Sequence, residues 1–148
     1  MDFTLQLDES ANRPIIKLDS LFEGCTALLD TGAILPLWTK SVELLEGLGG
    51  KLVKKDVSFS GFGGKVKGDL YSITLQLGSI LYPNMYLIAY NDESLPGFFL
   101  FSATMFQDMS FTVNNKAHSI TIMPGNQVCY HLKIEDSGGN LHVLINSE

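Results

Sequence analysis

Cysteine is scarce in this sequence, which contains only Cys25 and Cys129. The first four residues, Met1 to Thr4, have neither the basic start nor the apolar core of a signal peptide. In a chain without an export signal, two thiols far apart in the sequence are expected to be free rather than joined in a disulfide. We therefore expect a cytoplasmic protein with two free, buried thiols.

Positive charge is also scarce. Lysine and arginine number 10 against 16 aspartates and glutamates, which gives a net charge of −6. Proteins that bind nucleic acid use basic surfaces to neutralise phosphates, so this composition argues against nucleic acid as a partner. One group of lysines is too small for a basic binding face and is expected in a solvated loop or hairpin: Lys51, Lys54, Lys55, Lys65 and Lys67.

Long hydrophobic runs are absent as well. No apolar stretch approaches the ~18 residues that a membrane-spanning helix needs, so we expect no membrane contact. Hydrophobic residues nevertheless make up 45% of the chain and charged residues only 18%, which is typical of a chain with a buried core. The length of 148 residues is that of one domain.

The histidines and cysteines lack the spacing of a metal site. His118, His131 and His142 are not arranged as ligand pairs, and Cys25 has no histidine nearby in the sequence. Ser60 lacks the Gly-x-Ser-x-Gly context of a serine hydrolase, and the glycine-rich stretch after it lacks the strand-to-helix context of a phosphate-binding loop. We therefore expect no metal and no cofactor.

Alternation of apolar and polar residues predicts a mostly β chain. Residues 3–7 alternate as a half-buried strand does, and the apolar residues from Tyr71 to Leu77 fall on one face. Many short strands with one or two short helices favour a closed or sandwiched all-β domain. Strands are predicted at 3–7, 14–18, 25–29, 51–59, 66–77, 85–90, 111–113, 119–123, 128–134 and 141–145, and short helices at 39–48 and 102–109.

Asp30 places a charge at the end of the apolar run Ala27-Leu28-Leu29. An ionised carboxylate in apolar surroundings is costly unless it is paired. One explanation is a strand that ends in a turn, where Asp30 caps backbone N–H groups. Another is catalysis, because two carboxylates that share one proton can hydrolyse an amide. The ionised carboxylate takes a proton from water, and the protonated one polarises the carbonyl group.

The second carboxylate of such a pair is expected from an identical chain across a two-fold axis, because this chain has only one Asp-Thr-Gly. The Thr31 hydroxyl would then bond backbone across the interface, and Gly32 would let backbone N–H groups approach the carboxylate. Three other acidic residues are candidates within the chain, but none stands in a comparable loop: Asp69, Asp92 and Asp108.

Residues 28–33 resemble the active-site loop of the retropepsin-like, or retroviral-type, aspartic proteases. In this family a glycine-rich β-hairpin, the flap, closes over the substrate. Four residues between two predicted strands stand at the corresponding place: Gly61, Phe62, Gly63 and Gly64. The segment 99–106 and the strand pair within 110–122 match the family's later helix and strand pair, so the resemblance covers roughly residues 3–123.

The resemblance implies an acid-protease-like closed β barrel with one lobe per chain. It also implies a homodimeric aspartic endopeptidase that hydrolyses peptide bonds with a dyad of two Asp30 side chains, needs no cofactor and is more active at acid pH. Residues 1–123 would form the protease domain. Residues 124–148 would form a C-terminal β-hairpin extension that belongs to the same domain or to the dimer interface.

The resemblance also assigns the site residues. Asp30 would be the catalytic residue. The others would belong to the active-site loop or to the substrate-binding cleft and flap: Thr31, Gly32 and Ala33 in the loop, with Ile34, Gly61, Phe62, Gly63 and Gly64 around the peptide.

The sequence departs from the family at two places. Phe101 stands where the family carries a glycine after two apolar residues. Ile34, Leu35 and Pro36 follow Ala33, where the family carries polar residues. These departures motivate an alternative prediction, which is a catalytically inactive peptide-binding or dimerisation module with the same fold.

Overall fold

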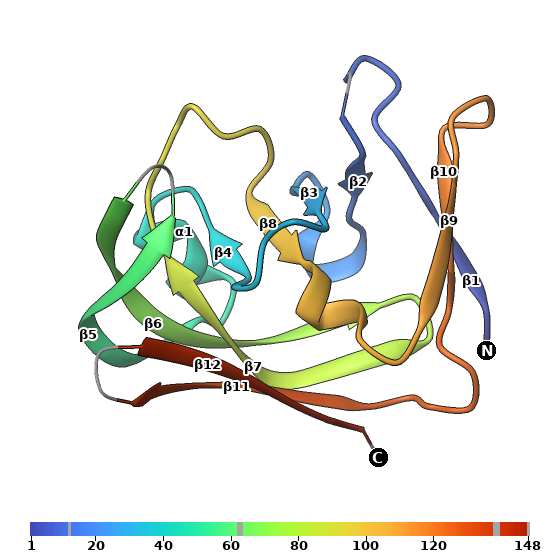
Figure 1. Cartoon of the computed structure of the whole chain (residues 1–148). Helices are drawn as coiled ribbons and strands as arrows, with labels where there is room; N and C mark the ends of the chain where they lie inside the picture. The colour runs from blue at the N-terminus through green and yellow to red at the C-terminus, as the bar shows by residue number, and fades with distance from the viewer. Residues whose placement is uncertain (12, 62–63, 138–139, 148) are drawn as a thin grey trace.

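Strands dominate the computed structural model, which describes residues 1–11, 13–61, 64–137 and 140–147 (Figure 1). Within these ranges there are one α-helix, α1 (Val42–Gly47), and two 3-10 helices, η1 (Ser20–Phe22) and η2 (Ala103–Phe106). The predicted mostly β chain is therefore confirmed. The strands are β1 (Phe3–Gln6), β2 (Ile15–Lys17), β3 (Thr26–Asp30), β4 (Leu37–Trp38), β5 (Lys51–Gly61), β6 (Gly64–Leu77), β7 (Ile80–Ala89), β8 (Phe99–Ser102), β9 (Ser110–Asn114), β10 (Ser119–Met123), β11 (Tyr130–Ser137) and β12 (Asn140–Ser147).

These strands form three hydrogen-bonded sheets. The largest has the order β2-β3-β8-β4-β7-β6-β5, a second has the order β1-β10-β9, and β11 pairs with β12. Among the described residues, β2 and β5 end the large sheet without pairing with each other, so the expected closed barrel is not found. The physical reason is that the strands near the chain ends pair elsewhere. β1 joins the β9–β10 hairpin and β11 folds onto β12, so neither bridges the two edges.

Helix α1 is shorter than the predicted helix over 39–48, because residues 39–41, which connect β4 to α1, are not helical. At the other end Gly49 has a φ of +100°, a left-handed conformation that ends the helix and suits glycine. The Tyr71 hydroxyl on β6 donates to Glu46 Oε2 at 2.9 Å. Burial and the Glu46 carboxylate together raise the pKa of Tyr71 to about 12, so this hydroxyl stays a donor at neutral pH and fastens the helix to the sheet.

The centre of the core is β8, whose four residues are all buried. The rings of Phe99 and Phe101 lie 5.6 Å apart, and the ring of Trp38 on β4 packs edge-on against Phe99 at 5.0 Å. Phe101 also packs against Phe106 of η2, at 6.3 Å between ring centroids. Each aromatic side chain buries a large apolar area, so this cluster fixes the position of β8 in the sheet.

Strand β8 lies between β3 and β4, although the chain runs from β3 to β4 without an intervening strand (Figure 1). β8 is parallel to β3, with Asp30 opposite Ser102, and antiparallel to β4, with Leu37 opposite Leu100. The connection between β3 and β4, residues 31–36, therefore crosses the carboxyl end of β8. This crossing brings the Asp-Thr-Gly stretch next to the start of η2.

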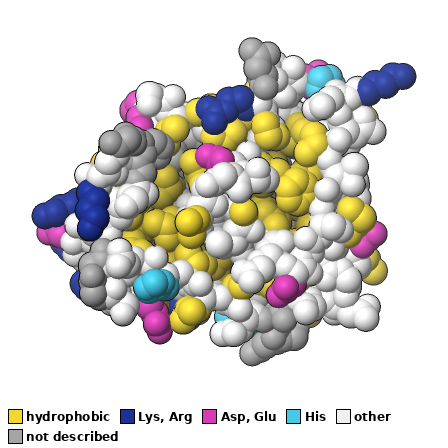
Figure 2. Space-filling model, viewed as in Figure 1, with side chains coloured by type: hydrophobic (Ala, Val, Ile, Leu, Met, Phe, Trp, Pro, Cys, Tyr) yellow, Lys and Arg dark blue, Asp and Glu magenta, His cyan; other side chains and the backbone are white. Residues whose placement is uncertain are grey.

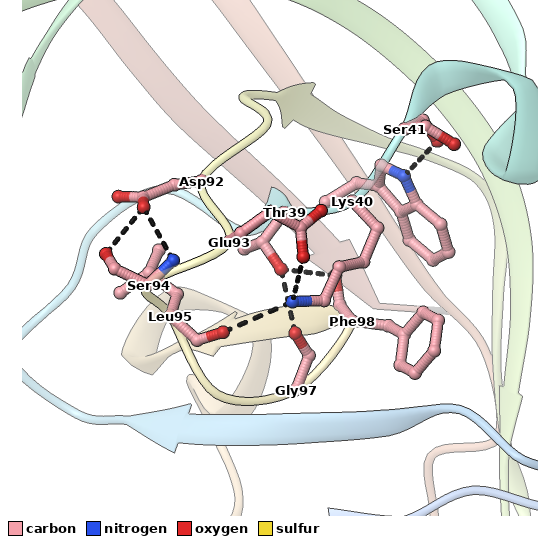
Figure 3. A network of polar contacts seen from close by, with 10 residues as sticks. Thr39, Lys40, Ser41, Asp92, Glu93, Ser94, Leu95, Gly97 and Phe98 are labelled. Atoms are coloured by element: carbon pink, nitrogen blue, oxygen red, sulfur yellow. Dashed lines mark hydrogen bonds and ion pairs between the residues drawn. The ribbon is translucent and has the colours of Figure 1, made fainter.

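The loop that delivers β8 into the sheet, residues 90–98, is held by polar contacts to the segment after β4 (Figure 3). The buried Thr39 hydroxyl donates to the carbonyl oxygens of Gly97 and Phe98, at 2.8 and 3.1 Å. Within the loop, the backbone N–H and hydroxyl of Ser94 donate to Asp92 Oδ1, which lowers the pKa of the Asp92 carboxyl. Thr39 thus fastens the loop where it returns to the sheet, and the bonds between Ser94 and Asp92 shape the loop itself.

Replacing Thr39 by valine is expected to lower the free energy of unfolding by about 1–3 kcal/mol, because the carbonyls of Gly97 and Phe98 lose a buried donor. Threonine and valine have nearly the same shape, so the change in the free energy of unfolding measures the contribution of the hydroxyl group. Urea denaturation followed by tryptophan fluorescence measures it. Ser94→Ala in the same loop removes an exposed hydroxyl and is expected to have a much smaller effect; equal losses in both variants would contradict the assignment.

The C-terminal hairpin, β11 and β12, packs against β7 of the same chain (Figure 1). Tyr130, Leu132 and Ile134 alternate along β11, and all three are buried, so one face of this strand belongs to the core. Nearer the tip, Lys54 Nζ on β5 lies 3.2 Å from Asp136 Oδ2. The hairpin is therefore attached both along β7 and beside β5.

Two predictions from composition concern thiols and membrane spans. Cys25 and Cys129 are both free, as predicted, but they are half-buried rather than buried. Burial raises the pKa of the Cys25 thiol. None of the helices in the described ranges has the length and apolar character needed to cross a membrane.

Candidate active site

Asp30 is the last residue of β3 and is half-buried. The three residues before it are buried in the hydrophobic core, and β3 lies between β2 and β8 in the sheet. The strand thus carries the carboxyl group from the core to the point where the chain turns toward the surface. A carboxylate in this position keeps contact with solvent while its backbone is fixed by the sheet.

The Asp30 side chain also organises the turn that follows it. The Gly32 N–H donates to Asp30 Oδ1 at 3.0 Å, and the Ala33 N–H donates to the Asp30 carbonyl at 3.1 Å. These are the bonds expected if Asp30 caps a turn. Among the described residues Asp30 Oδ2 has no hydrogen-bond partner, so one carboxylate oxygen is available to a ligand or to a second chain.

Residues at the start of η2 hold the far side of this turn. The Ala103 N–H donates to the Ala33 carbonyl at 3.1 Å, and the Thr104 hydroxyl donates to the Ile34 carbonyl at 2.6 Å. Ser102 Oγ lies 2.6 Å from Thr104 Oγ1, which orients that hydroxyl. The loop is therefore fixed by a segment about 70 residues further along the chain.

Thr31 and Gly32 are exposed at the crest of the turn. Within the described part of the chain the Thr31 hydroxyl makes no hydrogen bond, so its predicted role across a dimer interface stays a prediction. A Cβ atom at position 32 would lie 3.4 Å from Asp30 Oδ1, an ordinary van der Waals contact. Space within one chain therefore does not demand glycine at position 32.

A cleft of about 540 Å³ opens beside this turn. Its volume lies within the ~300–1,000 Å³ typical of ligand-binding pockets. Figure 2 shows one face of the molecule, in the orientation of Figure 1. Hydrophobic side chains gather over the middle of this face, and charged side chains lie mostly toward its edge. The turn contributes four of the predicted site residues to the cleft wall: Asp30, Gly32, Ala33 and Ile34.

The opposite side of the cleft is formed by the long hairpin of β5 and β6. These strands are antiparallel, with Ser60 opposite Lys65 and Gly61 opposite Gly64. Ser58, Phe59, Ser60 and Lys65 line the cleft, and Gly61 and Gly64 end the paired strands next to them. The predicted flap residues Phe62 and Gly63 lie outside the described residues.

Several cleft residues were not predicted from the sequence. Leu37 and Leu100 reach the cleft because β4 and β8 are neighbours in the sheet. Asn140 and Leu141 reach it from the start of β12. No local pattern marks these residues, since each is brought to the cleft by a strand pairing or packing contact distant in the sequence.

Among the described residues of the cleft wall, the charged ones are Asp30 and Lys65. The remaining wall is mostly apolar, which favours a ligand with apolar side chains. Among the described residues no three His, Cys, Asp or Glu side chains come close enough together to hold a metal ion. The chemistry that the cleft offers is therefore that of a half-buried carboxylate beside an apolar surface.

Comparisons with protein-family models, with curated proteins and with solved structures each gave no match.

Proposed function

We propose that this chain is one subunit of a homodimeric, retropepsin-like aspartic endopeptidase with an acid-protease-like fold. The observation that carries the proposal is the position of Asp30. Its carboxylate ends a buried strand, lines a cleft and has one oxygen without a partner among the described residues. A single carboxylate of this kind becomes a catalyst for amide hydrolysis when an identical one joins it across a two-fold axis.

In the proposed reaction two Asp30 side chains share one proton. The ionised carboxylate takes a proton from water as the water oxygen adds to the peptide carbonyl carbon, and the protonated one donates its proton to the carbonyl oxygen. The carboxyl group that took the proton from water then gives it to the leaving nitrogen as the carbon–nitrogen bond breaks, and one hydroxyl of the intermediate returns its proton to the other carboxylate. The bonds from Ala103 and Thr104 to the loop would hold each carboxylate in place during these steps.

The first departure from the family was Phe101 in place of a glycine. The register between β8 and β3 bears on this departure and supports the proposal. Ser102, and not Phe101, lies opposite Asp30. The two apolar residues before Ser102 are Leu100 and Phe101, and the side chain of Phe101 is fully buried in the aromatic cluster. A small residue after two apolar ones therefore lies opposite Asp30 in the sheet, and we propose that Ser102 takes the place of the family's glycine.

The second departure bears on the substrate. Ile34 is 66% exposed and lines the cleft with Ala33 and Leu35. Apolar residues in place of polar ones would favour apolar side chains in the bound peptide. The peptide would be extended, because β5 is an edge strand of the large sheet and Ser58 to Ser60 line the cleft. An edge strand offers backbone N–H and C=O groups to an added strand.

The alternative is a peptide-binding or dimerisation module with the same cleft. It is favoured by the bond from the Gly32 N–H to Asp30, because an aspartate that only caps a turn makes the same contact. In this case the cleft would bind peptides without cleaving them.

A dilution experiment tests the proposal directly. A mixed peptide library is incubated with the protein between about pH 4 and about pH 7, and cleavage is detected by mass spectrometry. Since each chain supplies half of the dyad, the cleavage rate per chain is expected to fall as dilution separates the dimer, which sedimentation measures in parallel. Cleavage by a species that sediments as a monomer, or no cleavage by a stable dimer at any of these pH values, would contradict the proposal.

A further inference from the structure

The start of β12 approaches the candidate active site from outside the β3–β8–β4 framework. Asn140 and Leu141 line the same cleft as Asp30, although they lie more than 100 residues away in the sequence. In the cleft wall they complete a surface that includes Phe59 of β5 and Ile34 of the active-site turn. The C-terminal hairpin therefore contributes a wall of the cleft and does not only cover the core.

This wall is held in place at several points. The Leu81 N–H on β7 donates to the Val128 carbonyl at 2.8 Å, just before β11 begins. Lys133 Nζ lies 4.4 Å from the centre of the Tyr86 ring, a cation–π contact that fastens β11 to β7. With the buried face of β11, these contacts give β12 a fixed support. A side chain on such a support can select between ligands by shape, because it cannot easily move aside.

The two residues offer different chemistry to a ligand. Leu141 is half-buried and apolar, whereas Asn140 is exposed and carries an amide that both donates and accepts hydrogen bonds. Leu141 thus contributes an apolar surface to the cleft that also contains Phe59, and Asn140 contributes a polar edge. Such a pair suits a peptide segment in which an apolar side chain is buried and the adjoining backbone amide stays polar.

We propose that Leu141 forms the wall of an apolar side-chain subsite for an extended peptide and determines the size of side chain accepted there. The inference rests on the proposed function insofar as it takes a peptide as the ligand. It assigns to the C-terminal hairpin a role in specificity and none in the chemical step.

The test measures binding, so it does not depend on cleavage. Asp30→Asn protein is titrated into fluorescein-labelled hexapeptides. In this peptide set each of the six positions in turn carries Ala, Val, Leu or Phe, while the other five positions stay the same. At the peptide position that contacts Leu141, Leu141→Ala is expected to strengthen binding of the Phe peptide relative to the Ala peptide. The ratio of their dissociation constants should change about tenfold, because a few methyl groups in a pocket have an effect of this size. Leu141→Phe is expected to change the same ratio in the opposite direction.

Leu144→Ala is the matched control. Leu144 lies on the same strand, is 43% exposed and is not part of the cleft wall, so its removal is expected to leave all ratios unchanged. Circular dichroism checks that each variant is folded, and the two Leu141 variants alter the side-chain volume in opposite senses, so one misfolded variant does not prevent the test.

The inference is overturned if neither folded Leu141 variant changes a ratio, if Leu144→Ala changes the same ratio equally, or if no peptide binds at concentrations up to about 1 mM. A separate cleavage assay with protein that retains Asp30 distinguishes the proposed protease activity from the proposed Leu141 subsite. Binding that depends on Leu141 without any cleavage rejects the protease and keeps the subsite. Cleavage with peptide preferences that ignore Leu141 keeps the protease and rejects the subsite.

Discussion

Replacement of Asp30 by asparagine is expected to lower peptide cleavage by about 1,000-fold or more, because the proposed dyad would lose both the group that takes a proton from water and the group that donates one. Both chains of the proposed homodimer would carry the change, so no intact carboxylate would remain in the site. The initial rate of cleavage of one identified peptide, measured at its best pH for both proteins, gives the ratio directly.

The substitution is expected to leave the fold intact. An asparagine Oδ1 can accept the Gly32 N–H that Asp30 Oδ1 accepts at 3.0 Å, so the turn keeps its bond. The urea midpoint and the sedimentation coefficient should therefore match those of the unaltered protein. Asp92→Asn is the matched control, since Asp92 lies in the loop 90–98 and not in the cleft wall, and it should cleave normally. Cleavage that survives in Asp30→Asn would reject the aspartic mechanism.

Replacement of Phe101 by glycine is expected to destabilise the protein by about 4–6 kcal/mol, because it removes a buried ring and leaves a cavity in the centre of the sheet. Phe101 has no exposed surface and packs against Phe99 and Phe106. For a domain of this size such a loss is comparable with the whole free energy of unfolding. Thermal and urea denaturation measure it, and a protein that is largely unfolded at room temperature is an expected outcome.

Ser102→Gly is the informative partner of this variant. Ser102 is buried, and among the described residues its hydroxyl forms a hydrogen bond only with the Thr104 hydroxyl, so its removal is expected to cost about 1–2 kcal/mol. The pair tests which position corresponds to the family's glycine. If Phe101→Gly is tolerated and Ser102→Gly unfolds the chain, the register of Asp30 with Ser102 is wrong.

Local patterns in the sequence predicted most of the strands. Burial of Tyr71, Ile73, Leu75 and Leu77 on one face of β6 follows the predicted alternation, because side chains on a strand point alternately to its two sides. The predicted strands 111–113 and 119–123 are also found, as the antiparallel pair β9 and β10. In each case the information lies within a few neighbouring residues.

Strands with little or irregular local pattern were missed or misplaced. β4 has only two residues and follows Pro36, so it is too short to show alternation. β7 begins at Ile80 and not at the predicted residue 85. Asn84 has a φ of +48° and donates its N–H to the Thr74 hydroxyl at 3.1 Å, and this irregularity interrupts the period of the strand.

The sequence by itself determined that Asp30 ends an apolar strand and is followed by a tight turn, because hydrophobic patterning and turn residues act over short range. Only the tertiary structure decided that β8 enters between β3 and β4, that Ser102 lies beside Asp30 and that Leu141 reaches the cleft. These contacts join residues far apart in the chain. They are selected by the combined packing of the core and the pairing of whole strands, and no single stretch of sequence contains that information.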